Sequence, residues 1–201
     1  MKTFRRSNKR KMSRMTIIIL GILGVLLIGD IVGALMYARQ TPTMQSELLV
    51  YIATGERLSF LQIFWQQFLY QFTIWTLGLT IIGNLVNIFL IFVRGVSAGF
   101  NMAVLIQKAS FGVLILWLFQ YLLIILTTVL SGYFSIRFAY LVIRALVLKK
   151  YALLKRHLKL YARQLVVIMV LTMITAVFST VTTPLVQNQF ITVATIENVN
   201  E

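Results

Sequence analysis

The 201-residue sequence contains no cysteine, a single histidine, two prolines and only five acidic residues. The absence of thiols excludes disulfide bonds, thiolate nucleophiles and cysteine-ligated metal sites. Charged residues make up 12% of the chain, against roughly a quarter in soluble domains, whereas 59% of the residues are hydrophobic. The mean hydropathy is +0.88. This composition excludes a soluble globular protein and is typical of a polytopic membrane protein.

Apolar runs long enough to cross a bilayer recur along the chain. A hydrocarbon core of about 30 Å requires about 20 apolar residues in a helix, and the clearest runs cover residues 16–36, 109–130 and 165–185. We therefore expect an all-α polytopic transmembrane helical bundle with about five spans. Its single transmembrane domain is expected at residues 16–185.

The basic residues are concentrated in two clusters. The sequence has 19 lysines and arginines against five acidic residues, a net charge of +14. Seven basic residues lie within the first 14 positions and six lie between Lys149 and Arg163, and each cluster directly precedes an apolar run. Such clusters are retained in the cytoplasm and meet anionic lipid headgroups. Their position favours a role in membrane topology over nucleic-acid binding.

This asymmetry predicts the orientation of the chain in a bacterial cell membrane. Residues 1–15 are expected to form a basic cytoplasmic tail, and residues 186–201 a short external tail. A cytoplasmic N-terminus with the second basic cluster also inside requires an odd number of crossings, because six would place that cluster outside.

The region between residues 60 and 107 allows two topologies, and both give five crossings. In the favoured one, residues 72–93 form a single span and residues 95–107 form a short re-entrant or interfacial helix. Residues 131–148 then cross separately from 109–130.

In the alternative topology, the 60–107 region is a hairpin of two spans, broken at Gly83-Asn84. Residues 131–148 would then lie along the cytoplasmic interface. The ends of the chain keep the same orientation in both arrangements.

Small residues at helical spacing predict close helix contacts. Gly29 and Gly33 form one GxxxG pair, and Gly95 and Gly99 form another, a spacing that lets two transmembrane helices approach closely. The second pair also reads G-x-S-x-G around Ser97, the form of a serine nucleophile elbow. The sole histidine lies in a distant basic run, so we favour the packing interpretation and expect no catalytic residue.

Asp30 is the only acidic residue within an expected span, so we expect it to be paired, protonated or hydrated. The favoured topology places Arg137 at nearly the same depth and predicts an Asp30–Arg137 contact. The hairpin topology would instead bring Arg94 towards Asp30. We found no metal-ligand cluster, phosphate-binding loop or dinucleotide motif, and therefore expect no metal, no cofactor and no enzymatic activity in this chain.

Several glycines carry a resemblance to a known family. The segment TLGLTIIGNLVNIFLIFVRGVSAGF resembles the core of the stage II sporulation protein M family. The matching positions are Leu77-Gly78, Gly83, Arg94-Gly95 and Gly99-Phe100. The order of the spans and loops agrees over nearly the whole chain, with one departure: Asn84 stands where family members often have a proline.

The resemblance implies a scaffold without catalytic activity. The best-known member of that family is regarded as a membrane anchor for peptidoglycan hydrolases during engulfment in sporulation. Relatives beside bacteriocin genes suggest an alternative, an export or maturation subunit that works with an ABC-type ATPase. The expected partners are thus the lipid bilayer and either cell-wall hydrolases or an ATPase.

Overall fold

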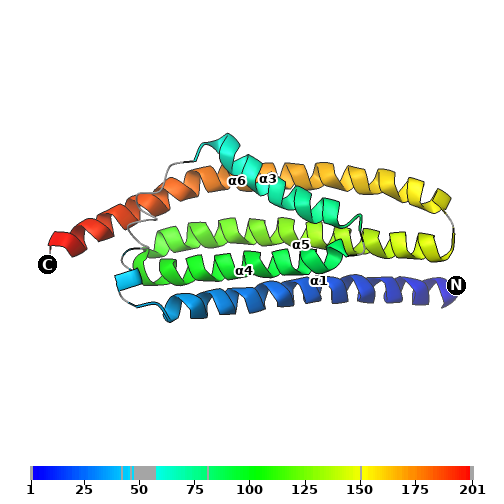
Figure 1. The fold of residues 1–201 in the computed structure, drawn as a ribbon, viewed down its shortest axis with the longest axis horizontal. Coiled ribbons are helices and arrows are strands. Elements are labelled where there is room, and N and C mark those ends of the chain that lie inside the picture. Colours follow the sequence, from blue (N-terminus) through cyan, green and yellow to red (C-terminus); the bar gives the residue numbers. More distant parts are fainter. Residues whose placement is uncertain are drawn as a thin grey trace.

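The computed structural model consists of long α-helices joined by short connections in the part of the chain that it describes (Figure 1). It describes residues 2–41, 43–45, 47, 58–80, 82–149 and 151–199, with side chains described only within 15–41, 43–45, 47, 58–80, 82–107, 109–149 and 157–188. The helices are α1 (Lys2–Ala38), α3 (Phe60–Leu77), α4 (Gly83–Lys108), α5 (Phe111–Val147) and α6 (Tyr151–Val199).

The long helices α1, α4, α5 and α6 run along one direction, and α3 lies obliquely beside them (Figure 1). The start of α1, the end of α5 and the start of α6 lie at one end of the bundle, which we call the basic end because both basic clusters belong to it. The ends of α1 and α4 and the start of α5 lie at the opposite end. Helices α3 and α4 form a hairpin whose turn points towards the basic end.

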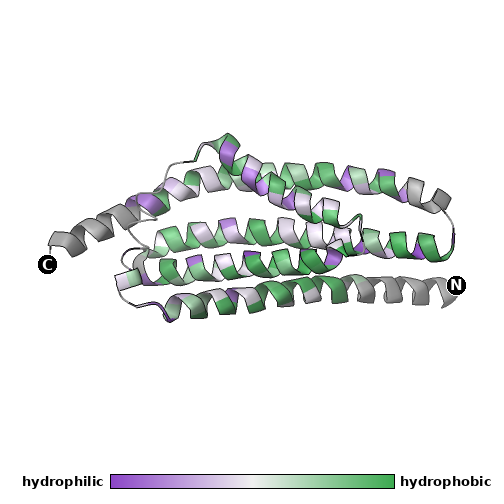
Figure 2. Cartoon of the chain, viewed as in Figure 1, coloured by the Kyte–Doolittle hydropathy of each residue, from purple (hydrophilic) through white to green (hydrophobic). Residues whose placement is uncertain are grey.

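Four helices in the described part of the chain are long and apolar enough to cross a membrane. Their candidate segments are Met15–Ala38, Gly83–Gln107, Phe111–Val147 and His157–Asn188, and apolar residues dominate along them in Figure 2. An all-helical, multi-pass membrane protein is therefore confirmed. Helix α3 is shorter and richer in glutamine, so the expected count of five spans is not established by length and hydropathy.

The predicted single span at residues 72–93 is wrong. Helix α3 ends at Leu77 and α4 begins at Gly83, so the chain reverses within that range. The amide of Gly78 donates to the carbonyl of Ile74 at 3.2 Å, which closes α3. The amide of Gly83 then donates to Oγ1 of Thr80 at 3.0 Å, which supports the start of α4. The turn is built from apolar and small residues, and hydropathy alone does not reveal it.

Residues 95–107 are not a separate re-entrant piece but the second half of α4. Likewise, 109–130 and 131–148 do not form two spans, because α5 continues through Ser131 and Gly132 without a break. Ser131 is fully buried and Gly132 faces Ile22 and Ile91, so packing stabilises the helix there. The hairpin expected in the alternative topology is thus present, although its turn lies just before Gly83-Asn84.

The apolar core joins α1, α3, α4 and α5. It is formed by Ile22, Leu26, Ile74, Ile91, Val129 and Tyr133. Many large apolar side chains point outwards instead, Leu20, Leu27 and Ile31 of α1 among them, each about 60% exposed. Such an exposed surface would be unfavourable in water but is compatible with lipid.

Candidate functional site

The first two thirds of α3 carry four glutamines. Ser59 caps this helix: its hydroxyl accepts from the amide of Gln62, whose side chain in turn accepts from the amide of Ser59. Gln67 and Gln71 follow at helical spacing and reach neighbouring helices. Gln67 donates to the hydroxyl of Ser179 at 3.0 Å, and Gln71 donates to the hydroxyl of Thr128 at 3.3 Å.

Ser179 joins three helices at one point. Its hydroxyl is buried and accepts from Gln67 of α3 and from Gln120 of α5, the latter at 2.7 Å. Because these bonds form inside an apolar bundle, they hold α3, α5 and α6 in register.

A polar cavity lies beside this junction. Its volume is about 310 Å³, and its walls come from α3, α4, α5 and α6 together with Leu58, which precedes α3. Most of the lining side chains are polar: Gln66, Gln67, Arg94, Ser97, Asn101, Gln120, Tyr121, Ser179 and Thr183. We call this space the polar cavity. Because polar side chains from four helices converge on it inside an apolar bundle, it is the candidate functional site.

Arg94 is the charged residue in the wall of the polar cavity. Its guanidinium carbon lies 4.9 Å from the centroid of the Tyr70 ring, a cation–π contact. The Tyr70 hydroxyl donates to the carbonyl of Leu90 at 2.8 Å, which fixes the ring under the guanidinium. Tyr70 belongs to α3 and Arg94 to α4, so this contact also ties the hairpin together.

The predicted Asp30–Arg137 contact is wrong. The Tyr121 hydroxyl lies 2.7 Å from each carboxylate oxygen of Asp30 and donates to that group. Because α5 is one continuous helix, Arg137 lies 16 residues, about 24 Å, further along it than Tyr121. Within the described part of the chain, neither Arg137 nor Arg94 forms an ion pair with Asp30.

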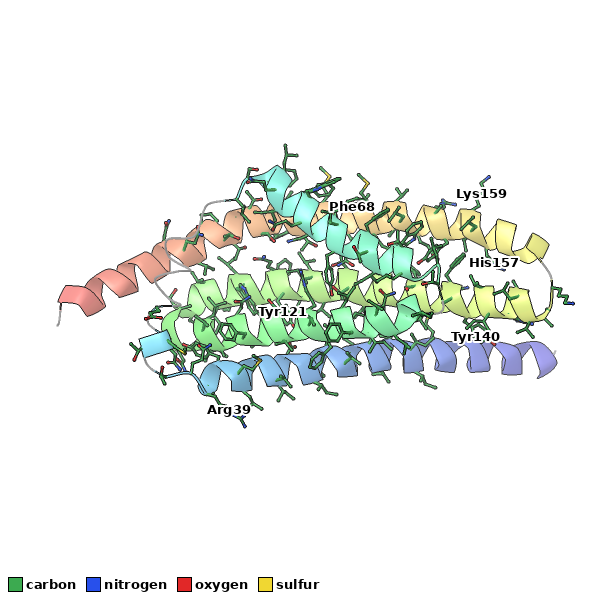
Figure 3. All side chains as sticks on the ribbon, in the orientation of Figure 1. Arg39, Phe68, Tyr121, Tyr140, His157 and Lys159 are labelled. Atoms are coloured by element: carbon green, nitrogen blue, oxygen red, sulfur yellow. The ribbon has the colours of Figure 1, made fainter. Side chains whose placement is uncertain are left out.

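Arg137 lies near the basic end instead. It is exposed and lines a shallow pocket with His157 and Gln164. Figure 3 shows the two regions apart, with Tyr121 and His157 in opposite halves of the bundle. The single histidine is therefore remote from the polar cavity.

The two GxxxG pairs face each other between α1 and α4. A Cβ atom added at Gly29 would lie 3.0 Å from the Cα of Gly95, and one added at Gly33 would lie 2.8 Å from the amide nitrogen of Phe100. A Cβ atom at Gly99 would overlap the backbone of Asp30. The backbones approach as closely as this motif allows in membranes.

The glycines near the hairpin turn are also in tight contacts. A Cβ atom at Gly78 would lie 2.7 Å from the Cα of Ser135, and one at Gly83 would lie 2.7 Å from the carbonyl carbon of Leu77. The turn therefore packs directly on α5. Beside it, the buried Asn87 donates to the carbonyl of Ile74 at 3.0 Å and to the hydroxyl of Ser135 at 2.6 Å.

Ser97 lies in the wall of the polar cavity and is exposed to it. A serine nucleophile needs a neighbouring base, but His157 lines a different pocket. Among the described residues, no group of three or more His, Cys, Asp or Glu side chains could hold a metal ion. The cavity wall instead presents amide, hydroxyl and guanidinium groups, which can form hydrogen bonds to a polar ligand.

Sequence reasoning did not identify Tyr121, Gln120 and Ser179 as site residues. They lie inside strongly apolar runs, where single polar residues are easily read as packing. The glutamines of α3 offered a signal, because Gln67 and Gln71 are four residues apart and share one side of the helix. Polar residues on one side of a membrane helix face protein or a cavity more often than lipid.

Comparison with known proteins identifies the family. The chain matches the family described as Stage II sporulation protein M over residues 14–184, a range that contains the whole polar cavity and both GxxxG pairs. Searches of the curated proteins and of the solved structures gave no match. Because the matched range covers most of the sequence, the chain belongs to the stage II sporulation protein M family.

Proposed function

We propose that the protein is a non-catalytic scaffold in the bacterial cell membrane that recruits or anchors peptidoglycan hydrolases during engulfment-type remodelling. Two observations together support the proposal: the chain belongs to the stage II sporulation protein M family, and close contacts connect its helices. Glycine contacts lock α1 to α4, and buried polar side chains tie α3 to α5 and α6. A rigid bundle suits an anchor, because a partner held on it keeps a fixed position.

The polar cavity supports the non-catalytic part of the proposal. Ser97, the serine of the G-x-S-x-G pattern, has no histidine beside it in the described wall of the cavity, and no carboxylate lines that wall either. Full activity of a Ser97→Ala variant in a complementation assay is expected. Loss of activity with an intact fold would favour a hydrolase instead.

Purification from the native host tests the scaffold role. The protein would be extracted in a mild detergent after reversible crosslinking, and the co-purifying proteins identified by mass spectrometry. We expect peptidoglycan hydrolases to be enriched over a control pull-down with an unrelated multi-pass protein. Enrichment of an ATPase or a peptide precursor without hydrolases would replace the scaffold with an export role.

That export role is a second candidate, in which the protein is a permease-like subunit working with an ABC-type ATPase. One observation favours it: α5 and α6 extend past the α3–α4 turn at the basic end (Figure 1), and Arg144 and Lys159 of these two helices are exposed. A basic projection could dock an acidic surface. Replacing Arg144 and Lys159 by glutamine should abolish ATPase binding in this case and leave a scaffold unaffected.

A further inference from the structure

We propose that the polar cavity is a binding site for an oxyanion of the phosphate class, with Arg94 as its cationic anchor. The site goes beyond the scaffold role and does not depend on it. Its ligand is either the phosphate of a membrane phospholipid headgroup or a free phosphate.

The first argument is charge. Arg94 is the single charged residue in the described wall of the polar cavity, and no acidic side chain joins it there. Asp30 of α1 accepts the hydroxyl of Tyr121, which also lines the cavity, and no ion pair joins Asp30 to Arg94 among the described residues. The Tyr70 ring lies against the guanidinium but carries no net charge. A cation inside a membrane bundle is costly without an anion, so the cavity lacks a negative partner.

The second argument is the arrangement of hydrogen-bond donors. Gln66, Ser97 and Asn101 line the polar cavity, and none of them has a hydrogen-bond partner within the described part of the chain. Ser97 and Asn101 lie three and seven residues after Arg94, so all three occupy one side of α4. Gln66 comes from α3 opposite. A guanidinium with amide and hydroxyl donors around it matches the oxygens of a phosphate.

The third argument is shape. The hairpin helices converge at their turn and separate away from it, as Figure 1 shows for α3 and α4. The polar cavity occupies the space between their separated halves, from Arg94 towards Leu58 and Asn101. Its volume of about 310 Å³ is at the lower limit for small-ligand sites. Ile63, Trp117 and Ile124 form an apolar part of the wall. This part could contact the uncharged portion of a ligand whose phosphate group lies at Arg94.

Binding to the purified, full-length protein in dodecyl maltoside tests the proposal. Native mass spectrometry would measure dioleoyl phosphatidylglycerol against dioleoylglycerol, which lacks the phosphate, and calorimetry would measure inorganic phosphate. We expect binding of phosphatidylglycerol at least tenfold tighter than dioleoylglycerol, or binding of inorganic phosphate. The first result assigns the site to a lipid headgroup and the second to a free phosphate. If inorganic phosphate does not bind, and phosphatidylglycerol binds no more tightly than dioleoylglycerol, the proposal is overturned.

Three variants locate the binding. Arg94→Gln removes the charge and should weaken binding at least tenfold, and Arg137→Gln, which removes an exposed arginine elsewhere, should leave binding unchanged. Ser97→Phe keeps Arg94 but fills the cavity, and should abolish binding even if Arg94→Gln does not fold. Circular dichroism and gel filtration would establish the fold of each variant. Unchanged binding in a folded Arg94→Gln or Ser97→Phe variant, or equal weakening by Arg137→Gln, would show that the anion binds outside the polar cavity.

Discussion

At the scale of single residues, buried polar side chains connect helices that are distant in the sequence. Tyr121 reaches Asp30 across 91 positions, and Gln67 reaches Ser179 across 112. Hydrogen bonds between membrane helices contribute modestly, about 0.6 kcal/mol on average and up to about 1.7 kcal/mol. Their value lies in specificity, because each bond forms in only one arrangement of the helices.

The Asp30–Tyr121 bond gives the first prediction. A double-mutant cycle with Asp30→Ala and Tyr121→Phe should give a coupling free energy of about 0.5–1.7 kcal/mol, because each single change removes the same hydrogen bond. Unfolding in mixed micelles with increasing dodecyl sulfate would provide the free energies.

Two controls define this cycle. Tyr140→Phe alters an exposed tyrosine of the same helix (Figure 3) and should show no coupling to Asp30. Arg137→Ala should show none either, since Arg137 lies far along α5. A coupling between Asp30 and Arg137 as large as that with Tyr121 would favour the ion pair expected from the sequence.

Asn87 provides the second prediction. It is 1% exposed, and its amide joins α4 to the end of α3 and to Ser135 of α5. Asn87→Leu should lower the unfolding free energy by about 1–3 kcal/mol, because buried groups lose their partners. Asn101→Leu, in the wall of the polar cavity, should cost far less, since Asn101 has no partner among the described residues. Equal effects in the same micelle assay would contradict the bridging role of Asn87.

At the scale of elements, the closest helix pair is α1 with α4. Their contact depends on the absence of side chains at four glycines, so a single methyl group should separate the backbones. Gly33→Ala should therefore lower the unfolding free energy by at least about 1–3 kcal/mol, the typical cost of overpacking.

Gly24→Ala is the matched control for this third prediction. It lies on the same helix, but an added Cβ would meet no atom within 4 Å. Alanine has the higher helix propensity, so this change should be neutral or stabilising by up to about 1 kcal/mol. Similar destabilisation by both changes would contradict the close packing of Gly33 against α4 as the reason for the effect.

A helix could be predicted from the sequence where hydropathy and charge together mark its boundary. The first span, expected at 16–36, corresponds to the candidate segment Met15–Ala38 because charge ends where the apolar run begins. The turn after Leu77 was predicted only in the alternative topology, with its break at Gly83-Asn84, because Leu79 and Ile82 are as apolar as the helices around them. The partner of Asp30 was missed for a related reason: only cations were considered, and a tyrosine in an apolar run gave no sign of its role.

At the scale of the whole molecule, the helices differ in length from the thickness of the hydrocarbon core: α5 is longer than the core and α3 is shorter. Helix α5 has 37 residues and is about 55 Å long, well beyond a hydrocarbon core of about 30 Å. It must tilt or project at the basic end, where Arg137 and Arg144 are exposed. Helix α3 has 18 residues, about 27 Å, and falls slightly short of that core. The number of crossings therefore depends on the depth of the α3–α4 turn.

Because the chain contains no cysteine, single cysteines can report this depth without background. We expect Lys149→Cys and Thr80→Cys to react with a membrane-impermeant maleimide only from the cytoplasmic side, and Thr41→Cys to react only from outside. Five crossings require this pattern, since the turn and the basic end would then share one face. Thr80→Cys should react more slowly than Lys149→Cys, because the exposed Leu79 and Ile82 hold the turn near the lipid. If Thr80→Cys reacts only with a lipid-soluble maleimide, the hairpin is re-entrant and the chain crosses three times, with the same orientation of both ends.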